Sequence, residues 1–227
     1  NELVRPAVAN IDQALVVFAV TKPKPHFNLL DRFLVMMETK EIPAILCFNK
    51  ADIAGDAEIA GLKAVYENCG YPLIFTSAKK EENIDRLKEL LQGKTTAAAG
   101  PSGVGKSSLI NRLQSGVKME TGSISRKIER GKHTTRHSEL IMLGDESYIM
   151  DTPGFSSLYA GNMEKEDLKY CFPEFAPYEG KCRFNGCGHI HEPGCAVKQA
   201  ADEGKIHRIR YEDYVMMYRE LQERKRY

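Results

Sequence analysis

The stretch GPSGVGKS, residues 100–107, decides the fold class of this chain. It matches the pattern G-x-x-x-x-G-K-S/T and stands between a strand-like run at 95–99 and a helix-like run at 107–113, which is the setting that this motif requires. Glycines in such a loop let successive backbone N–H groups surround phosphate oxygens at a helix N-terminus. The stretch therefore predicts a loop that binds the phosphates of a nucleotide.

Two residues of this loop have predicted side-chain roles. Lys106 is expected to contact the β- and γ-phosphates, and the Ser107 hydroxyl is expected to bind Mg²⁺. We expect the neighbouring residues to line the phosphates as well, and these are Ser102, Gly103, Val104, Gly105 and Ser108.

A second motif, Asn49-Lys50-Ala51-Asp52, follows the strand-like run at 43–48 and bears on the choice of base. A carboxylate there can accept hydrogen bonds from both N1–H and the exocyclic amine of guanine, a pair of donors that adenine does not offer. We therefore predict that Asn49, Lys50 and Asp52 bind guanine and that the nucleotides are GTP and GDP. The alternative is a P-loop kinase or ATPase in which Asp52 plays no part in base choice.

Two further motifs end predicted strands. Ser77, Ala78 and Lys79 resemble the second guanine-contacting segment of Ras-like GTPases, in which the backbone N–H at the alanine position meets the base oxygen. Asp151 and Gly154 belong to the sequence DTPG, where the aspartate can bind the Mg²⁺ shell and the glycine N–H can sense the γ-phosphate. Four motifs at four strand ends support one nucleotide site.

The polar segment GKHTTR, residues 131–136, lies between the phosphate loop and DTPG and is typical of a switch. Thr135, with Thr134 as the other candidate, is predicted to complete the Mg²⁺ ligands when GTP is bound. The residue after the DTPG glycine is Phe155, where Ras-like proteins have the glutamine that orients water. A phenyl ring cannot act as a base, so we predict slow intrinsic hydrolysis with His133 as the catalytic group. An exposed loop histidine is the alternative.

Short apolar runs alternate with helix-period stretches between residues 14 and 150, which is typical of parallel βα units. The predicted strands are 14–20, 43–48, 72–76, 95–99, 140–143 and 147–150. Asn83 is predicted to be the N-cap of a helix that carries Ile84, Leu87 and Leu91. These patterns predict an α/β fold.

The order of the motifs is unusual. In Ras-like GTPases the phosphate loop comes first and the guanine motifs come last, whereas here the segments 49–52 and 76–79 precede 100–107. A sheet tolerates such a rearrangement when the old termini lie close together. We therefore predict that residues 1–157 form a circularly permuted Ras-like P-loop GTPase domain.

Residues 158–227 are predicted to form a small, mostly helical domain built around zinc. Cys182, Cys187, His189 and Cys195 offer three thiolates and one imidazole, as in closed structural zinc sites. His191 is a rival nitrogen donor. Clustering of cysteines with histidine indicates metal binding rather than disulfides, and it suits a reducing compartment.

The last helix-like stretch carries an aromatic stripe that is predicted to pack, and the stripe consists of Tyr211, Tyr214, Tyr218 and Leu221. Basic residues near it could meet RNA phosphates, although a solvated helix face is the simpler interpretation. The net charge of the chain is only +1, so RNA contact requires local basic patches. The apolar runs are far shorter than the roughly 20 residues of a membrane helix, so we expect no membrane contact. We also expect a monomer in the cytoplasm.

Taken with the permuted order, four stretches make the chain resemble the RsgA family of bacterial GTPases. They are GKHTTR at 131–136, DTPGFSSL at 151–158, FPEF at 172–175 and the cysteine cluster. The resemblance implies late maturation of the small (30S) ribosomal subunit, GTP hydrolysis stimulated by that subunit, and contact with its rRNA. It also implies catalysis by His133 and zinc at Cys182, Cys187, His189 and Cys195. Family members carry an N-terminal OB-fold, which we expect to be missing here.

A binding module is the alternative to an enzyme. In that hypothesis the nucleotide pocket is a catalytically weak sensor of GDP or GTP on ribosomal RNA, and Phe155 marks lost catalysis. The two hypotheses differ in whether turnover appears once a partner is supplied.

Overall fold

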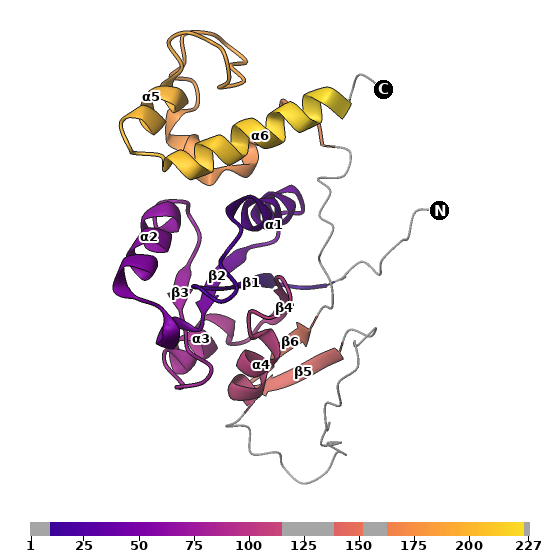
Figure 1. Cartoon of the computed structure of the whole chain (residues 1–227). Coiled ribbons are helices and arrows are strands. Elements are labelled where there is room, and N and C mark those ends of the chain that lie inside the picture. Colours follow the sequence, from indigo (N-terminus) through magenta and orange to yellow (C-terminus); the bar gives the residue numbers. More distant parts are fainter. Residues whose placement is uncertain (1–9, 115–138, 152–162, 225–227) are drawn as a thin grey trace.

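The structure, a computed structural model, describes residues 10–114, 139–151 and 163–224 (Figure 1). Its centre is a six-stranded sheet of order β3-β2-β1-β4-β6-β5. The strands are β1 (Gln13–Ala19), β2 (Ala44–Asn49), β3 (Leu73–Phe75), β4 (Thr95–Ala99), β5 (Glu139–Gly144) and β6 (Ser147–Asp151). All neighbouring strands are parallel except β5 and β6. All six predicted strands are confirmed to within one residue at each end.

Helices cover both faces of the sheet. Helices α1 (Phe27–Thr39) and α2 (Asp56–Tyr66) pack on one face, and α3 (Ile84–Leu91) and α4 (Lys106–Gln114) pack on the other. Successive side chains of β1 point to opposite faces of the sheet. Val16 and Phe18 therefore join the core under α1 and α2, whereas Leu15 and Val17 join the core under α3 and α4. The result is the three-layer α/β architecture that the sequence predicts.

Asn83 occupies the N-cap position of α3, as predicted, but it does not cap the helix with its side chain. Its φ of 58° is left-handed, and its side chain makes no capping hydrogen bond. Its Nδ2 instead donates to the Phe75 carbonyl oxygen at 2.8 Å. The loop before α3 folds back through a bridge between Ser77 and Glu82, and this turn directs the amide toward the strand.

The C-terminal region contains a third hydrophobic core, to which Val35 of α1 also contributes. It contains the short 3-10 helices η2 (Leu168–Cys171) and η3 (Pro173–Tyr178) and the helices α5 (Ala196–Asp202) and α6 (Arg208–Arg224). The predicted packing of the stripe on α6 is confirmed, since Tyr214 and Leu221 lie in this core and Tyr211 and Tyr218 pack against it. A core formed mostly by residues after 163 supports our proposal of a second domain, whose boundary at 157 and 158 lies outside the described residues.

Helix α6 lies across α1 (Figure 1) and is held by a buried arginine that the sequence reading did not single out. The NH1 atom of Arg210 lies 2.6 Å from Oδ1 of Asp31 on α1, and its Nε lies 2.7 Å from Oε1 of Glu174 on η3. Tyr66 of α2 donates to the same Asp31 oxygen at 2.9 Å. Removing one member of a fully buried ion group leaves an uncompensated charge, so this cluster fixes the C-terminal region on α1 and α2.

Asp213 of α6 adds a second carboxyl to this cluster. It accepts from Asn28 Nδ2 at 2.9 Å, and its charge adds to the rise that burial causes in the pKa of Asp31. The Oδ2 atoms of Asp31 and Asp213 are both buried and have no hydrogen-bond partner among the described residues. A buried carboxylate oxygen without a donor disfavours the charged form of Asp31.

The pH dependence of stability follows from this arrangement. Burial raises the pKa of Asp31 from 3.8 to about 7, with Arg210 opposing the rise and Asp213 adding to it. Because the folded pKa is above the unfolded one, the stabilisation is complete below about pH 4 and is lost as the pH rises through about 7. We expect the unfolding free energy of the wild type to fall over this window, relative to Asp31→Asn, by on the order of 2–4 kcal/mol.

Urea unfolding of both proteins at several pH values between 4 and 8 measures this difference. The comparison cancels groups that titrate alike in both proteins, such as the histidines. Tyr66 donates to Asp31 and Glu174 shares its partner Arg210, but neither residue changes between the two chains. Parallel pH profiles for the wild type and Asp31→Asn would contradict the assignment.

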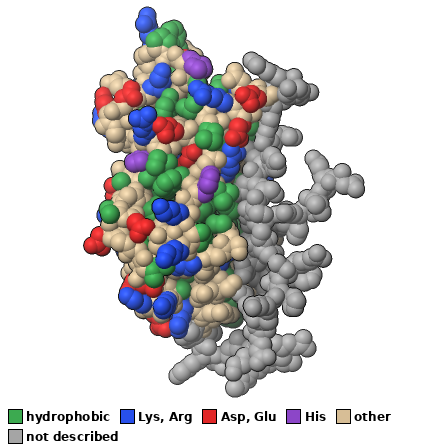
Figure 2. Space-filling model, viewed as in Figure 1, with side chains coloured by type: hydrophobic (Ala, Val, Ile, Leu, Met, Phe, Trp, Pro, Cys, Tyr) green, Lys and Arg blue, Asp and Glu red, His purple; other side chains and the backbone are tan. Residues whose placement is uncertain are grey.

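Charged side chains of both signs lie intermingled over the face drawn in Figure 2. That face therefore carries no large field of one sign, as the small net charge of +1 leads one to expect. Within the described part of the chain, no helix combines the length and apolar character that a membrane span requires.

Candidate functional site

The loops that carry the predicted nucleotide motifs leave the sheet at one edge. The segments 49–52, 76–79 and 100–107 follow the carboxyl ends of β2, β3 and β4. Asp151 ends β6 in register with Ala98 of β4. Ligands of open parallel sheets bind outside the carboxyl ends of the strands, so the fold brings three predicted motifs and Asp151, the first residue of the fourth, to the position where a nucleotide would bind.

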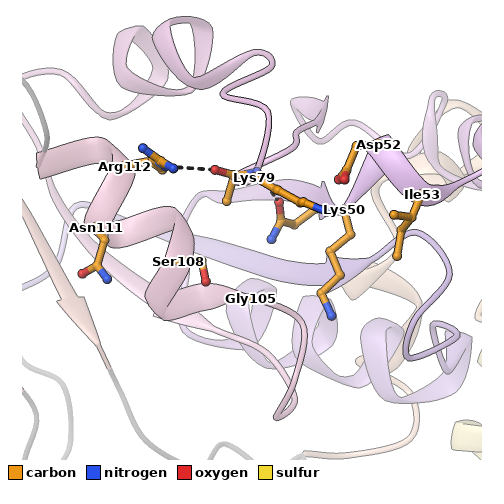
Figure 3. A pocket seen from close by; sticks show the side chains of 10 residues that line it. Lys50, Asp52, Ile53, Lys79, Gly105, Ser108, Asn111 and Arg112 are labelled. Atoms are coloured by element: carbon orange, nitrogen blue, oxygen red, sulfur yellow. Dashed lines mark hydrogen bonds between the residues drawn. The ribbon is translucent and has the colours of Figure 1, made fainter. Parts of the chain in front are cut away.

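A cavity of about 700 Å³ lies at this edge (Figure 3), a size suited to a nucleotide. The predicted site residues that line it are Asn49, Lys50, Asp52, Ala78, Lys79, Gly105 and Ser108. Other predicted residues of the two loops are not among the described lining, and these are Ser77, Ser102, Gly103, Val104, Lys106 and Ser107. Base-recognition residues and the end of the phosphate loop therefore share one cavity.

Asn49 connects three of the loops. Its buried side chain donates from Nδ2 to the Val104 carbonyl oxygen at 3.0 Å, and its Oδ1 accepts from the Ala78 N–H at 3.1 Å and from Thr76 Oγ1 at 3.3 Å. Much of its hydrogen-bonding capacity is used within the protein. Asn49 therefore orients the loops in addition to lining the cavity, a role that the sequence interpretation missed.

The Ala78 N–H differs from its prediction. It was expected to face the base oxygen, but in the structure it donates to Asn49 Oδ1 at 3.1 Å. A guanine oxygen would compete with that amide oxygen for the same donor. The prediction is therefore compatible with this loop only if the Asn49 bond is shared or replaced when the base binds.

Asp52 is held by a neighbouring hydroxyl. Ser77 Oγ donates to Asp52 Oδ1 at 2.7 Å and accepts from the Lys80 N–H at 3.0 Å. Ser77 is completely buried, so its contribution is to orient the carboxylate. The predicted contact of Ser77 with the base stays a prediction.

The phosphate loop depends on its glycines. Gly100 has a φ of 142°, and a Cβ there would overlap the Val17 carbonyl oxygen. Gly105 has a φ of 93°, and a Cβ there would overlap the Asn49 amide. Val104 is fully buried, so its side chain anchors the loop in the core and only its backbone is available for a phosphate.

Two lysines interact with the phosphate loop itself. Lys106, the first residue of α4, donates from Nζ to the carbonyl oxygens of Gly100 and Pro101 at 2.7 and 2.8 Å. Lys50 is in the left-handed region with a φ of 65°, and its Nζ donates to the carbonyl oxygens of Lys22 and Gly103, each at 2.6 Å. Both ammonium groups are thus positioned beside the loop where phosphate charge would accumulate.

Several predicted residues lie outside the described part of the chain. They are His133, Thr134, Thr135 and Gly154. Asp151 is described only as the backbone end of β6. Of the two predicted Mg²⁺ ligands, only Ser107 is described, and it lies half-buried in the first turn of α4.

The cavity also contains three residues that the sequence interpretation missed, namely Ile53, Asn111 and Arg112. A signal for two of them was present in the helix after the phosphate loop. Residues three and four apart share a helix face, so Asn111 and Arg112 follow from Ser108 by spacing. Ile53 is 48% exposed at the cavity wall, and no local pattern marks it.

The four predicted zinc ligands come together in the C-terminal region. Their ligand atoms all lie within 4.8 Å of one another. Cys182 Sγ lies 3.6 Å from His189 Nδ1 and 3.9 Å from Cys195 Sγ, and Nδ1 lies 3.3 Å from Cys195 Sγ. A tetrahedral zinc ion with bonds of about 2.3 Å to sulfur and 2.0 Å to nitrogen requires ligand separations of roughly 3.5 to 3.8 Å. The separations among Cys182, His189 and Cys195 are close to these values, and Cys187 lies near enough to be the fourth ligand. His191 is exposed and outside the cluster.

Hydrogen bonds hold the loop that carries His189. Although burial works in the opposite direction, the N–H groups of Gly188, Ile190 and His191 lower the pKa of Glu192 to about 2. Burial lowers the pKa of His189, which keeps the imidazole neutral as a ligand must be. The tyrosines of α6 complete the support, because Tyr211 and Tyr214 donate to the carbonyl oxygens of His189 and Gly188, each at 2.7 Å.

Comparisons with known proteins agree with this geometry. The family model described as RsgA GTPase matches residues 1–160. The "small ribosomal subunit biogenesis GTPase RsgA" of Agathobacter rectalis is 60% identical over all 227 residues, which cover 75% of that protein. The protein of the same name from Alkaliphilus metalliredigens is 48% identical and is covered to 78%.

Two solved structures share the fold. YjeQ from Thermotoga maritima superposes with a TM-score of 0.81 at 38% identity, over 97% of this chain and 74% of that one. YloQ, described as a circularly permuted GTPase, superposes with a TM-score of 0.76 at 37% identity, over 95% and 69%. Fold and loop order define a circularly permuted P-loop GTPase. The chain belongs to the RsgA GTPase family.

Proposed function

We propose that this chain hydrolyses GTP to GDP and phosphate and acts in the biogenesis of the small (30S) ribosomal subunit. The observation that carries the proposal is the 60% identity over all 227 residues to a relative named for this function. The cavity at the sheet edge supports it, because base-recognition and phosphate-loop residues line one space.

The base and the phosphates bind to different loops in this proposal. Asp52, oriented by Ser77, accepts from guanine N1–H and the exocyclic amine. The backbone of 102–105 surrounds the phosphates, with Ser108 at the start of the following helix. Lys106 exchanges the carbonyl oxygens of its own loop for β- and γ-phosphate oxygens.

Magnesium and zinc have different roles here. Mg²⁺ neutralises phosphate charge. We assign Ser107 and Thr135 to it as direct ligands, and Asp151 to the shell of groups around the ion. Cys182, Cys187, His189 and Cys195 would together fill the four positions of a tetrahedral ion, so zinc would be structural and not catalytic.

The proposal also assigns a catalytic residue and the partners of the chain. Phe155 cannot orient water, so we assign that task to His133, with Thr134 as the alternative Mg²⁺ ligand in the same segment. The small subunit and its rRNA are the partners that stimulate turnover late in its assembly, and the chain acts as a monomer in the cytoplasm. The second candidate is a static guanine-nucleotide sensor, which Phe155 favours.

GTP turnover with and without purified small ribosomal subunits separates these functions. For the enzyme we expect slow turnover alone and strong stimulation by subunits, which His133→Ala abolishes while GDP binding stays unchanged. Stimulation arises because a partner completes a site that lacks its water-orienting group. Tight GTP binding with no turnover in the presence of subunits, also in the longer relative from Agathobacter rectalis, would favour the sensor.

A further inference from the structure

Arg112 joins the helix of the phosphate loop to the loop that faces the base. It lies on α4, which begins at Lys106, and it reaches out of that helix toward the loop around Lys79 (Figure 3). Its Nε donates to the Ala78 carbonyl oxygen at 3.0 Å, and its NH1 donates to Glu81 Oε1 at 2.6 Å. Arg112 also lines the nucleotide cavity. One side chain thus spans the two halves of the site.

The peptide groups on either side of Ala78 are anchored from opposite directions. The Ala78 N–H donates to Asn49 Oδ1 at 3.1 Å, and the Ala78 carbonyl oxygen accepts from Arg112 Nε. The N–H and the carbonyl of Ala78 belong to two planar peptide groups that meet at its Cα, so anchoring both limits rotation about the φ and ψ angles of this residue. The position of this N–H relative to the cavity is therefore set by Asn49 and Arg112 together.

The hydrogen bonds of Arg112 to Glu81 and to the Ala78 carbonyl oxygen differ in their expected contribution. The pair with Glu81 is solvent-exposed, at 42% and 61% of the two side chains, and exposed ion pairs contribute little. The bond to the Ala78 carbonyl is charge-assisted and has a fixed direction, because the guanidinium is planar. The carbonyl bond is therefore the one that orients the loop.

We propose that Arg112 is a positioning residue for base recognition: it holds Ala78 at the cavity, where its N–H can be shared between Asn49 Oδ1 and the base oxygen of guanine. This inference rests on the proposed function, since it requires guanine to occupy the cavity. Arg112 does not touch the phosphates in this role. Its loss should weaken the binding of bases that carry the oxygen and should leave other bases unaffected.

Binding of three diphosphates to Arg112→Ala tests this. GDP and inosine diphosphate both carry the base oxygen, whereas 2-aminopurine riboside diphosphate lacks it. We expect GDP and inosine diphosphate each to bind about tenfold more weakly than to the wild type, which corresponds to the loss of the one hydrogen bond from the Ala78 N–H to the base oxygen. The 2-aminopurine compound should change less than about twofold. Arg86→Ala, an exposed arginine on α3 outside the cavity, is the matched control.

A general structural role would give a different pattern. If all three nucleotides weaken equally, or if none weakens, the positioning role of Arg112 is overturned. Thermal unfolding of Arg112→Ala shows whether the variant is folded, and Glu81→Gln, which keeps the carbonyl bond, should bind GDP like the wild type. If the wild type binds ADP as tightly as GDP, the proposed function itself fails. A guanine preference that survives unchanged in Arg112→Ala refutes only the inference on Arg112.

Discussion

Replacing Asp52 with asparagine is expected to convert the guanine site into one that prefers xanthine. The carboxylate can accept from both N1–H and the exocyclic amine of guanine, whereas an amide offers one acceptor and one donor. Xanthine carries an oxygen in place of that amine. Because the Ser77 hydroxyl donates to Asp52 Oδ1 at 2.7 Å, the asparagine oxygen should take this position and leave its NH₂ for the xanthine oxygen.

The expected loss in GDP affinity for Asp52→Asn is about a hundredfold or more, since two charge-assisted hydrogen bonds are affected. Xanthosine diphosphate should then bind more tightly than GDP. Competition with fluorescent nucleotides measures both affinities. Asp56→Asn is the matched control, because Asp56 is an exposed carboxylate in the first turn of α2 and does not line the cavity. Unchanged GDP affinity in Asp52→Asn would contradict the assignment of the base site.

Cys187→Ser is expected to have the largest effect on stability. The wild type should contain one zinc ion per chain, and the variant should lose it, because a serine hydroxyl is a poor substitute for a thiolate. Structural zinc supplies about 10–16 kcal/mol in small zinc domains. A loss of at least about 3 kcal/mol in the C-terminal region is therefore expected. Metal analysis together with limited proteolysis of this region measures both effects.

His191→Ala is the matched control for the zinc site. His191 is the rival nitrogen donor in the sequence, but the structure places it outside the ligand cluster and exposed to solvent. This variant should keep its zinc and its protease resistance. Wild-type protein without stoichiometric zinc would refute the metal assignment, and zinc loss in His191→Ala would refute the choice of His189.

Local patterns were sufficient to predict the elements and the metal cluster. The strands follow from short apolar runs, and the phosphate loop follows from glycines whose positive φ the structure confirms at Gly103 and Gly105. The cysteines and His189 are near neighbours in sequence, so one loop system can bring them together. These features depend on spacing along the chain, which the sequence displays directly.

Contacts between distant segments were not predictable in this way. Arg210, Asp31 and Glu174 lie on three separate elements and meet in the fold. Their spacing along the sequence does not indicate that they are neighbours. Asn49 was expected to bind the base, yet its partners at Ala78 and Val104 become neighbours only when three strands align. The side-chain contact of Asn83 was also not predictable from the local sequence, because the fold-back of its loop directs the amide toward the strand.

The ability of GTP and ATP to displace labelled GDP tests the central claim most directly, namely that the segments 49–52 and 100–107 form one guanine-nucleotide site. The account predicts that unlabelled GTP displaces GDP at comparable concentrations and that ATP fails even at about a thousandfold excess, because its base leaves Asp52 without donors to pair with. Displacement by ATP as effective as that by GTP would contradict the account and would leave a phosphate loop without a guanine site.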